Sequence, residues 1–456
     1  MGIPMPMLYL VALIAFVAVL FVFLKRPMYE VMTASFFFII LVSGQFDLMW
    51  SSLLYPSTSS LFYAIFAFMV VAVLFDATKV VQRIINLMLA VVGRFRGGAG
   101  YVSLLGSTFM ASLSGTGPGN VAATGVFTIP TMKKAGYPSR LAATTEMSSS
   151  MLGNIIPPSG IVLLTFGILN EVNPGSITLS QWIVAAYGIG FWFFVQRWLT
   201  LWGLCKYYKV SPIVKKDLPP FKSSLRIGWP ALILPALIFV PLLADAQFTG
   251  AIVSRIGADG AESFSSSVLM FTPGIAGAYA IGIGRKSFFS SSRSYIDRLV
   301  SVFKKSLSQV VPIGVTIYMA YATSKVFAGM QMEEVVRNWF VSMNMSVPIM
   351  IVVLPFFFMI LGMVLPGSAQ IAILGGAMIA AFGALGGDPV LFALMLPAMT
   401  GALEGMTPPL ALGLFVAMGI AGSGFKETSK LAVLWILLHV LLTIILLTGF
   451  LPIFGL

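Results

Sequence analysis

The stretch SGTGPGN at residues 114–120 interrupts an otherwise apolar segment of the chain. Three glycines and a proline within seven residues break a helix. At bilayer depth, such a break is tolerated only where the freed backbone groups are buried in protein or line a cavity. A second break, GNIIPPSG, follows at residues 153–160. The two breaks predict a binding site near the middle of a membrane.

Both breaks recur in the second half of the chain. Adding 251 to the residue number carries Gly136 onto Gly387, Pro138 onto Pro389, Pro157-Pro158 onto Pro408-Pro409, and Ser114-Gly115 onto Leu365-Pro366. Broken apolar segments at matching positions of two halves are the sequence pattern of a secondary transporter, whose substrate and ion sites lie where the repeats meet. We therefore predict two repeats that correspond without gaps.

The composition excludes a soluble protein. Hydrophobic residues make up 58% of the 456 residues and charged residues only 9%, and the mean hydropathy is +0.98. These values are typical of a polytopic membrane protein. The single Cys205 and the single His439 exclude an internal disulfide and the usual metal clusters. We expect His439 to be a packed residue and the protein not to be an enzyme, because no catalytic pair or nucleotide motif is found.

The apolar runs predict an all-α polytopic membrane protein built from two inverted repeats. The first repeat spans residues 1–205, with a re-entrant helical hairpin at 99–134 and a proline-broken helix at 139–170. A linker at 206–226 joins it to the second repeat at 227–456, whose hairpin is expected at 350–384 and whose broken helix at 390–421. Each repeat then has about five crossings. Because five is odd, the second repeat is inverted relative to the first. A polar loop is expected at 245–263.

The distribution of basic residues agrees with this topology. With these crossings, 23 of the 27 Lys and Arg residues fall on one side of the membrane and 3 on the other. By the positive-inside rule the basic side, with the 206–226 linker, is cytoplasmic, and both termini lie outside. The net charge of +12 therefore does not indicate nucleic acid.

The breaks offer the chemistry of cation and anion sites. A helix that begins at a break points unpaired N–H groups into the membrane and favours anions. A helix that ends at a proline leaves carbonyl groups unpaired, and oxygen ligands of this kind suit Na⁺. The first predicted ion site comprises Ser114, Gly115, Gly117, Asn120, Gly153, Asn154 and Pro157, and the second comprises Leu365, Gly367, Ser368, Gly405, Met406 and Thr407. The alternative is that these glycines and prolines only kink packed helices.

Two carboxylates, Glu146 and Glu404, fall inside the broken crossings, where an unpaired charge is costly and usually functional. Glu146 accompanies Ser and Thr residues at 144–150, which either contact substrate or pack helices together. The substrate-contact candidates are Thr116, Ser149, Ser150, Thr400 and Glu404.

These motifs resemble the large membrane subunit of tripartite ATP-independent periplasmic (TRAP) transporters. The resemblance lies in 114–120, 124–130, 133–138 and 154–158, and in the second half in 365–368, 387–389 and 407–409. Glu146 and the phrase FTIP at 127–130 are closer to the branch with TAXI-type receptors. One departure is TGPG at 116–119, where many members have Ser-Ala, and it leaves the details of the first ion site open.

The resemblance implies Na⁺-coupled uptake of an organic anion by an elevator movement. It also implies a soluble extracytoplasmic solute receptor, a separate small four-helix membrane subunit, and the cytoplasmic membrane of a bacterium or archaeon. The alternatives are a receptor-independent anion symporter of the same superfamily and, less consistent with the midplane breaks, a channel. The sequence does not specify the substrate, because the receptor would select it.

Overall fold

The computed structural model describes residues 4–114, 117–288, 295–343, 345–408 and 411–456. Every regular element in these ranges is a helix. The first half contains α1 (Met5–Ala18), α2 (Met28–Ser43), α3 (Leu48–Leu54), α4 (Ser60–Ala77), α5 (Val80–Val92), α6 (Gly98–Ser114), α7 (Gly117–Lys134), α8 (Ser139–Met151), α9 (Gly160–Val172) and α10 (Leu179–Tyr207). The predicted all-α class is confirmed.

The next helix is α11 (Phe221–Gly228), which begins inside the predicted 206–226 linker. The remaining helices are α12 (Ile233–Phe288), α13 (Tyr295–Gly329), α14 (Met332–Ser342), α15 (Val347–Leu361), α16 (Gly367–Gln370), α17 (Gly376–Ala384), α18 (Pro389–Met399), α19 (Gly401–Glu404), α20 (Leu412–Ala421) and α21 (Phe425–Leu447). A π-helical turn, Ile371–Gly375, joins α16 to α17. The boundaries of the two repeats stay a prediction.

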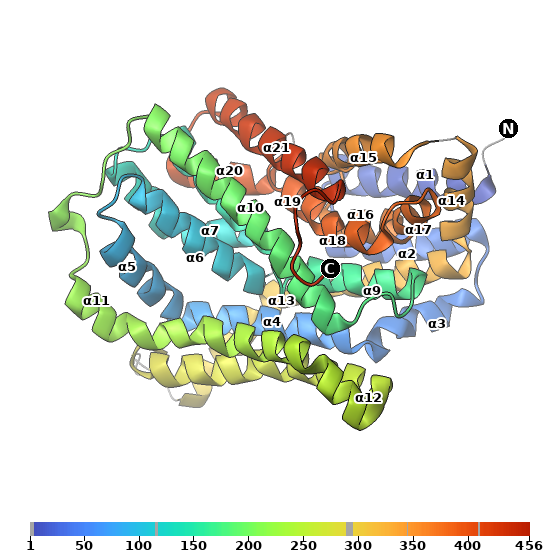
Figure 1. The fold of residues 1–456 in the computed structure, drawn as a ribbon, viewed down its shortest axis with the longest axis horizontal. Coiled ribbons are helices and arrows are strands. Elements are labelled where there is room, and N and C mark those ends of the chain that lie inside the picture. The colour runs from blue at the N-terminus through green and yellow to red at the C-terminus, as the bar shows by residue number, and fades with distance from the viewer. Residues whose placement is uncertain (1–3, 115–116, 289–294, 344, 409–410) are drawn as a thin grey trace.

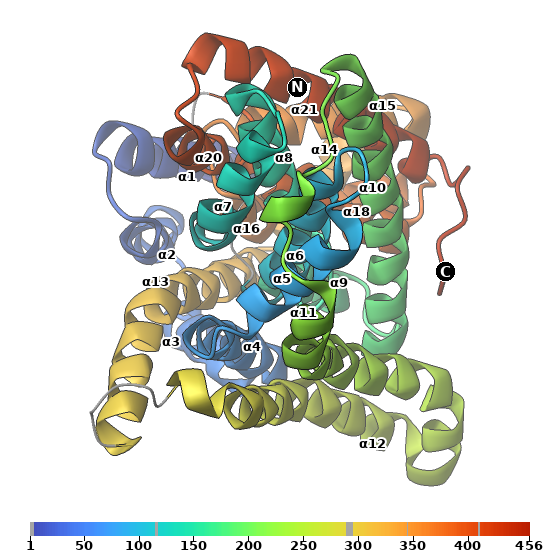
Figure 2. The same ribbon diagram turned by 90° about the vertical axis from the view of Figure 1, so that its left-hand side faces the viewer.

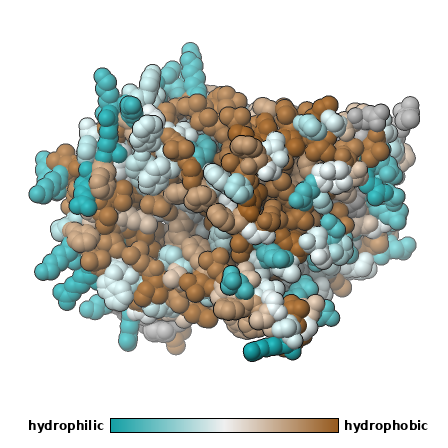
Figure 3. All heavy atoms as spheres, viewed as in Figure 1, coloured by the Kyte–Doolittle hydropathy of each residue, from teal (hydrophilic) through white to brown (hydrophobic). Residues whose placement is uncertain are grey.

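The surface is that of a multi-pass membrane protein. Six helical stretches among the described residues are long and apolar enough to cross a membrane. Other predicted crossings consist of shorter apolar helices, such as α9 and α20, because a break divides them. Figure 3 shows apolar residues over the middle of the molecule and polar residues gathered toward its two ends. The membrane normal therefore runs along the horizontal axis of Figure 1.

The helices form two groups, seen along the membrane normal in Figure 2. Helices α1–α4, α12 and α13 pack on one another and make an outer wall, here called the frame. Helices α6–α9 and α15–α21 make a second group, here called the bundle, which contains both predicted hairpins and both broken helices. α10 contacts α12 of the frame and α21 of the bundle.

The two halves correspond with one shift in register. Helices α7 and α16 begin at Gly117 and Gly367, positions 250 apart. Helix α7 ends shortly before a left-handed glycine, Gly136 (φ 82°), and α17 ends shortly before another, Gly386 (φ 92°), so these glycines are also 250 positions apart. The predicted gapless offset of 251 is therefore wrong for the hairpins, although it holds for Pro157 and Pro408. The second half therefore has one more residue between Gly386 and Pro408 than the first half has between Gly136 and Pro157.

The polar loop that we expected at residues 245–263 is helical in the structure. These residues continue α12, which is helical on both sides of Gly257. Gly257 has φ 77° and ψ 175°, a conformation that glycine adopts without steric cost. A single glycine therefore makes the corner for which we predicted a polar loop.

Candidate functional site

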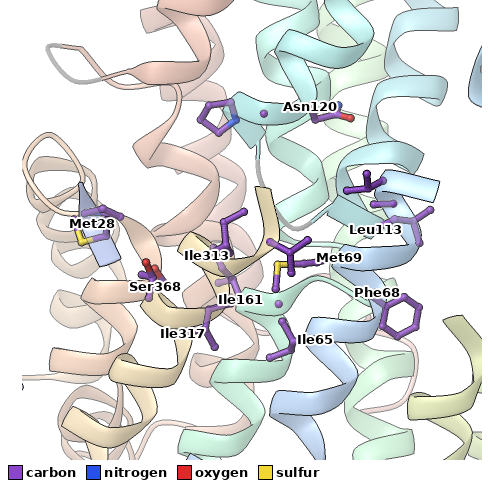
Figure 4. A pocket seen from close by; sticks show the side chains of 18 of the residues that line it. Met28, Ile65, Phe68, Met69, Leu113, Asn120, Ile161, Ile313, Ile317 and Ser368 are labelled. Carbon is purple, nitrogen blue, oxygen red and sulfur yellow. The ribbon is translucent and has the colours of Figure 1, made fainter. Parts of the chain in front are cut away.

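A cavity of about 620 Å³ lies between the bundle and the frame. Figure 4 shows Asn120 and Ser368 facing it from two elements of the bundle, across from Ile65, Met69, Ile313 and Ile317 of the frame. The bundle contributes Pro118, Gly119 and Asn120 from α7, Pro158 from the first break, Pro366 and Ser368 from the start of α16, and Glu404 from α19. Segments from both hairpins and both breaks therefore meet at one cavity.

The walls of this cavity are mainly apolar, with few polar groups. α4 and α13 supply most of the apolar side chains. The polar lining residues are Asp76, Asn120, Thr316, Ser368 and Glu404. None of the described residues that line the cavity is Lys, Arg or His. A concave, apolar site with a few convergent polar groups is typical of small-molecule binding.

The first predicted ion site lies at the junction of α6 and α7. Ser114 ends α6 and Gly117 begins α7, whereas Gly115 and Thr116 lie outside the described residues. Asn120 is buried, and its amide nitrogen donates to the carbonyl of Ser107 (2.9 Å) and to the hydroxyl of Ser150 (2.8 Å). Asn120 thus joins both arms of the first hairpin to α8.

The first break brings Asn154 to the second half of the chain. Asn154 is 1% exposed, and its Nδ2 donates to the carbonyl of Gly401. Its Oδ1 is buried with no hydrogen-bond partner among the described residues. An unsatisfied buried acceptor is costly, and an amide oxygen is a group that can ligate a hard cation. Pro157 is buried beside Pro158, which lines the cavity.

The second predicted ion site is built mostly from backbone. The Gly367 N–H donates to the carboxylate of Glu404. The carbonyl of Leu365 accepts from Gln370 (2.8 Å), and the carbonyl of Gly405 accepts from the Leu414 N–H (3.1 Å). Ser368 lines the cavity. The remaining members are buried: the Met406 sulfur lies 3.8 Å from an Arg197 nitrogen, and the Thr407 hydroxyl donates to the Leu403 carbonyl.

Close backbone packing explains two of the glycines. A Cβ on Gly367 would lie 2.5 Å from Gly401 Cα, and one on Gly153 would lie 2.2 Å from the backbone carbon of Ala111. Neither neighbour can move without moving a helix. A Cβ on Gly117 would instead meet the end of the Met151 side chain at 2.1 Å, which is flexible.

The substrate candidates separate into three groups. Glu404 lines the cavity. Ser149 and Thr400 are buried and donate to helix carbonyls at Thr145 (2.7 Å) and Leu396 (2.8 Å), and neither lines the cavity. The Ser150 hydroxyl accepts a hydrogen bond from the Asn120 amide (2.8 Å) and is separated from the cavity by Asn120. Thr116 lies outside the described residues. Among the described candidates, only Glu404 is placed for direct contact.

Comparison with known proteins identifies the family. The family described as "Tripartite ATP-independent periplasmic transporter, DctM component" matches residues 3–454. This chain belongs to the DctM family. The predicted resemblance to the TRAP large membrane subunit is confirmed, whereas the branch with TAXI-type receptors stays a prediction. The DctM-family chain is a transporter subunit, as expected, and not an enzyme.

Relatives of this DctM-family chain are named as TRAP transporter large permease proteins. The C4-dicarboxylate protein DctM of Pseudomonas aeruginosa is 24% identical over 378 residues, covering 82% of this chain and 80% of the relative. The sialic acid protein SiaM of Vibrio cholerae is 20% identical, covering 78% and 77%. The isethionate permease protein DctMQ of Oleidesulfovibrio alaskensis is 24% identical, covering 84% of this chain and 56% of that protein.

Two solved transporters have a similar fold. YdaH of Alcanivorax borkumensis superposes with a TM-score of 0.61 at 17% identity, covering 90% of each chain. MtrF of Neisseria gonorrhoeae has a TM-score of 0.60 at 11% identity, covering 90% of this chain and 85% of MtrF. At these identities the likeness concerns the fold alone.

The sequence analysis of this DctM-family chain missed the surroundings of Glu146. This carboxylate is fully buried and accepts from five hydroxyls: Ser107 (2.8 Å), Thr124 (2.5 Å) and Ser150 (3.2 Å) on Oε1, and Ser103 (2.6 Å) and Thr128 (2.5 Å) on Oε2. Ser103 and Ser107 share one face of α6, and Thr124 and Thr128 share one face of α7, because each pair is four residues apart. That spacing was visible in the sequence and could have predicted the arrangement.

A buried basic cluster lies elsewhere in the DctM-family bundle. Arg197 of α10 is 1% exposed and lies 2.8 Å from His439 Nδ1. His439 Nε2 lies 2.9 Å from the Ala398 carbonyl. Because an arginine can only donate, His439 Nδ1 accepts and Nε2 carries the proton. His439 therefore joins α10, α18 and α21 as a packing residue, and neither residue lines the cavity.

Proposed function

We propose that this chain is the large membrane component of a secondary-active importer that couples the uptake of an organic anion to Na⁺. The observation that carries the proposal is that segments of both hairpins and both broken helices line one cavity. Helix starts at such a place offer N–H groups to an anion, and helix ends offer carbonyl groups to a cation.

The charge of the cavity supports coupling to a cation. Asp76 and Glu404 line it, and no described lining residue is basic. An organic anion would therefore add negative charge to an already acidic, largely apolar site, which is unfavourable. Na⁺ bound at Asn154 and at the Gly405–Thr407 carbonyls would offset this repulsion. The anion and the cations would then bind together, which is the requirement for symport.

The division into bundle and frame supports an elevator movement. The cavity has one wall on each group, α7, α16 and α19 on the bundle side and α4 and α13 on the frame side. The frame side is mostly apolar and contributes few polar groups. The bundle can therefore slide along it without breaking many hydrogen bonds and carry the site across the membrane.

Names of the relatives indicate the substrate class and the partners. C4-dicarboxylate, sialic acid and isethionate are all organic anions; the first two carry carboxylates and isethionate carries a sulfonate. We propose an organic anion carrying a carboxylate for this chain, as in the first two relatives. The proposed partners are a small four-helix membrane subunit and a soluble extracytoplasmic receptor. The proposed location is the bacterial or archaeal cytoplasmic membrane, with both termini outside.

Reconstitution tests the tripartite part of the proposal. The purified chain alone in proteoliposomes is expected to take up little of the receptor's own radiolabelled ligand, because nothing delivers it. Adding the small subunit and the loaded receptor is expected to raise the initial rate at least tenfold under an inward Na⁺ gradient. A K⁺ gradient of equal size is the control. Rapid uptake by the chain alone would favour the receptor-independent symporter.

Cysteine labelling tests the orientation. Cys205 is buried and is replaced by alanine to remove background. A cysteine at Ser211, in the linker, is expected to react with an impermeant maleimide only after the membrane is permeabilised. A cysteine at Asp259 is expected to react in intact cells. The reverse pattern would contradict the assignment of both termini to the outside.

A further inference from the structure

Glu146 is a fully buried carboxylate that forms no ion pair with a basic side chain of the described residues. Its carboxylate accepts five hydroxyl hydrogen bonds from α6, α7 and α8. Hydrogen bonds of this kind stabilise the charged form of a carboxylate. Hydroxyl groups bring no net charge, however, and among the described residues no Lys, Arg or His lies within ion-pair distance of Glu146.

The basic residues of the elements packed on α8 are exposed or engaged elsewhere. Lys134 of α7, Lys206 of α10, and Lys426 and Lys430 of α21 are exposed, unlike the buried Glu146. Arg197 contacts the carbonyl of Ser148, which lies about 200° around the helix from Glu146. Lys133 of α7 donates to the carbonyl of Ala421, and Arg140 pairs with Glu427 of α21 at 2.9 Å. Helices α6 and α20 contain no charged residue, and α19 contributes only the acidic Glu404. No basic side chain of the described residues therefore balances the negative charge that the Glu146 carboxylate carries when it is ionised.

This negative charge lies directly behind the wall of the cavity. Asn120, which lines the cavity, donates to the Ser150 hydroxyl at 2.8 Å and lies 3.4 Å from the Thr124 hydroxyl. Both hydroxyls contact Glu146 Oε1. One layer of hydroxyl groups thus separates the carboxylate from the residue predicted to bind the first cation.

We propose that Glu146 is the counter-charge of the cation bound at the first ion site. The carboxylate is not a ligand of the cation, because its two oxygens are occupied by hydroxyl donors. It acts through the field that it creates at Asn120, and at buried sites such fields reach well beyond contact distance. Glu146 is in this sense a positioning residue for the cation, and the inference rests on the proposed function.

Charge and shape can be separated with two substitutions. Glu146→Gln keeps the size of the side chain and removes the charge, whereas Glu146→Asp keeps the charge and shortens the side chain. The readout is the melting temperature of the purified full chain, titrated with NaCl in choline chloride at constant ionic strength, because a bound ligand stabilises the folded state. Transport is not required for this measurement.

Glu146→Gln is expected to raise the half-saturating Na⁺ concentration on the order of tenfold, and Glu146→Asp to raise it less than threefold. If Glu146 contributes only packing and hydrogen bonds, Glu146→Asp, which shortens the side chain, is expected to raise the half-saturating Na⁺ concentration more than Glu146→Gln does. An unchanged midpoint in Glu146→Gln, or a larger shift in Glu146→Asp, would overturn the inference. Should Na⁺ fail to stabilise the wild-type chain at all, the proposed ion sites themselves would be wrong.

A further variant covers the case in which Glu146→Gln does not fold. Replacing Ser103 and Thr128 by alanine removes both Oε2 donors and leaves the charge. The Na⁺ midpoint of this double variant is expected to stay within threefold of wild type, although its melting temperature without Na⁺ falls. A tenfold rise in its midpoint would show that the hydroxyl network, and not the charge, controls the cation site, and the inference would fail.

Discussion

Replacing Gly367 by alanine is expected to abolish Na⁺-driven uptake, with a loss of at least a hundredfold. The added Cβ would lie 2.5 Å from both Cα and N of Gly401, a distance that real Cβ atoms do not reach. Both neighbours are backbone, so α16 and α19 must move apart. The same movement separates the Gly367 N–H from the Glu404 carboxylate. Initial uptake rates in proteoliposomes, together with the melting temperature, measure the effect.

Substitutions of two other glycines serve as controls for Gly367→Ala. A Cβ added to Gly419 would have no neighbouring atom within 4 Å, so Gly419→Ala is expected to transport at close to the wild-type rate. Gly117→Ala meets only the flexible end of Met151 and is expected to lose much less activity than Gly367→Ala. Near-normal uptake by Gly367→Ala would mean that the second hairpin tip and the second break do not need to touch.

The second large effect is expected for Asn154→Ala. This change removes the donor to the Gly401 carbonyl and the free Oδ1. Leaving a buried carbonyl unpaired costs about 1–3 kcal/mol, and the lost oxygen ligand weakens the binding of the cation further. We therefore expect the half-saturating Na⁺ concentration to rise at least tenfold in a thermal titration with NaCl.

Thr407→Ala is the matched comparison for Asn154→Ala. The Thr407 hydroxyl already donates to the Leu403 carbonyl, four residues before it, so its removal is expected to shift the Na⁺ midpoint by less than threefold. A larger shift in Thr407→Ala than in Asn154→Ala would contradict the assignment of Asn154 as the free ligand. That result would indicate that the main cation site lies at the second break.

Much of the architecture was predictable because backbone chemistry dictates it. The clusters of glycine and proline at 114–120 and 153–160 disfavour a continuous helix, and the apolar runs set the all-α class. The contacts between the breaks were not predictable. That Asn154 reaches Gly401, and that Gly367 lies against the same glycine, depends on how two distant segments pack. A pattern along one chain does not specify such packing.

The register of the second repeat relative to the first was also not predictable from the sequence. The double prolines at 157 and 408 suggested a single offset, but the helix starts at Gly117 and Gly367 reveal one residue more in the second half. An extra residue at a helix break changes little in composition, so no sequence signal marks it. The hydroxyl groups around Glu146, in contrast, were visible as pairs spaced by four residues.

The most direct test of the central claim is a Na⁺ titration of the purified wild-type chain, followed by its melting temperature at constant ionic strength. Cation sites at the breaks predict a saturable rise of several degrees with NaCl, absent with choline chloride, and moved to at least tenfold higher Na⁺ in Asn154→Ala. Equal melting curves in NaCl and choline chloride, or a midpoint that Asn154→Ala leaves unchanged, would contradict the claim that this cavity binds Na⁺ at its broken helices.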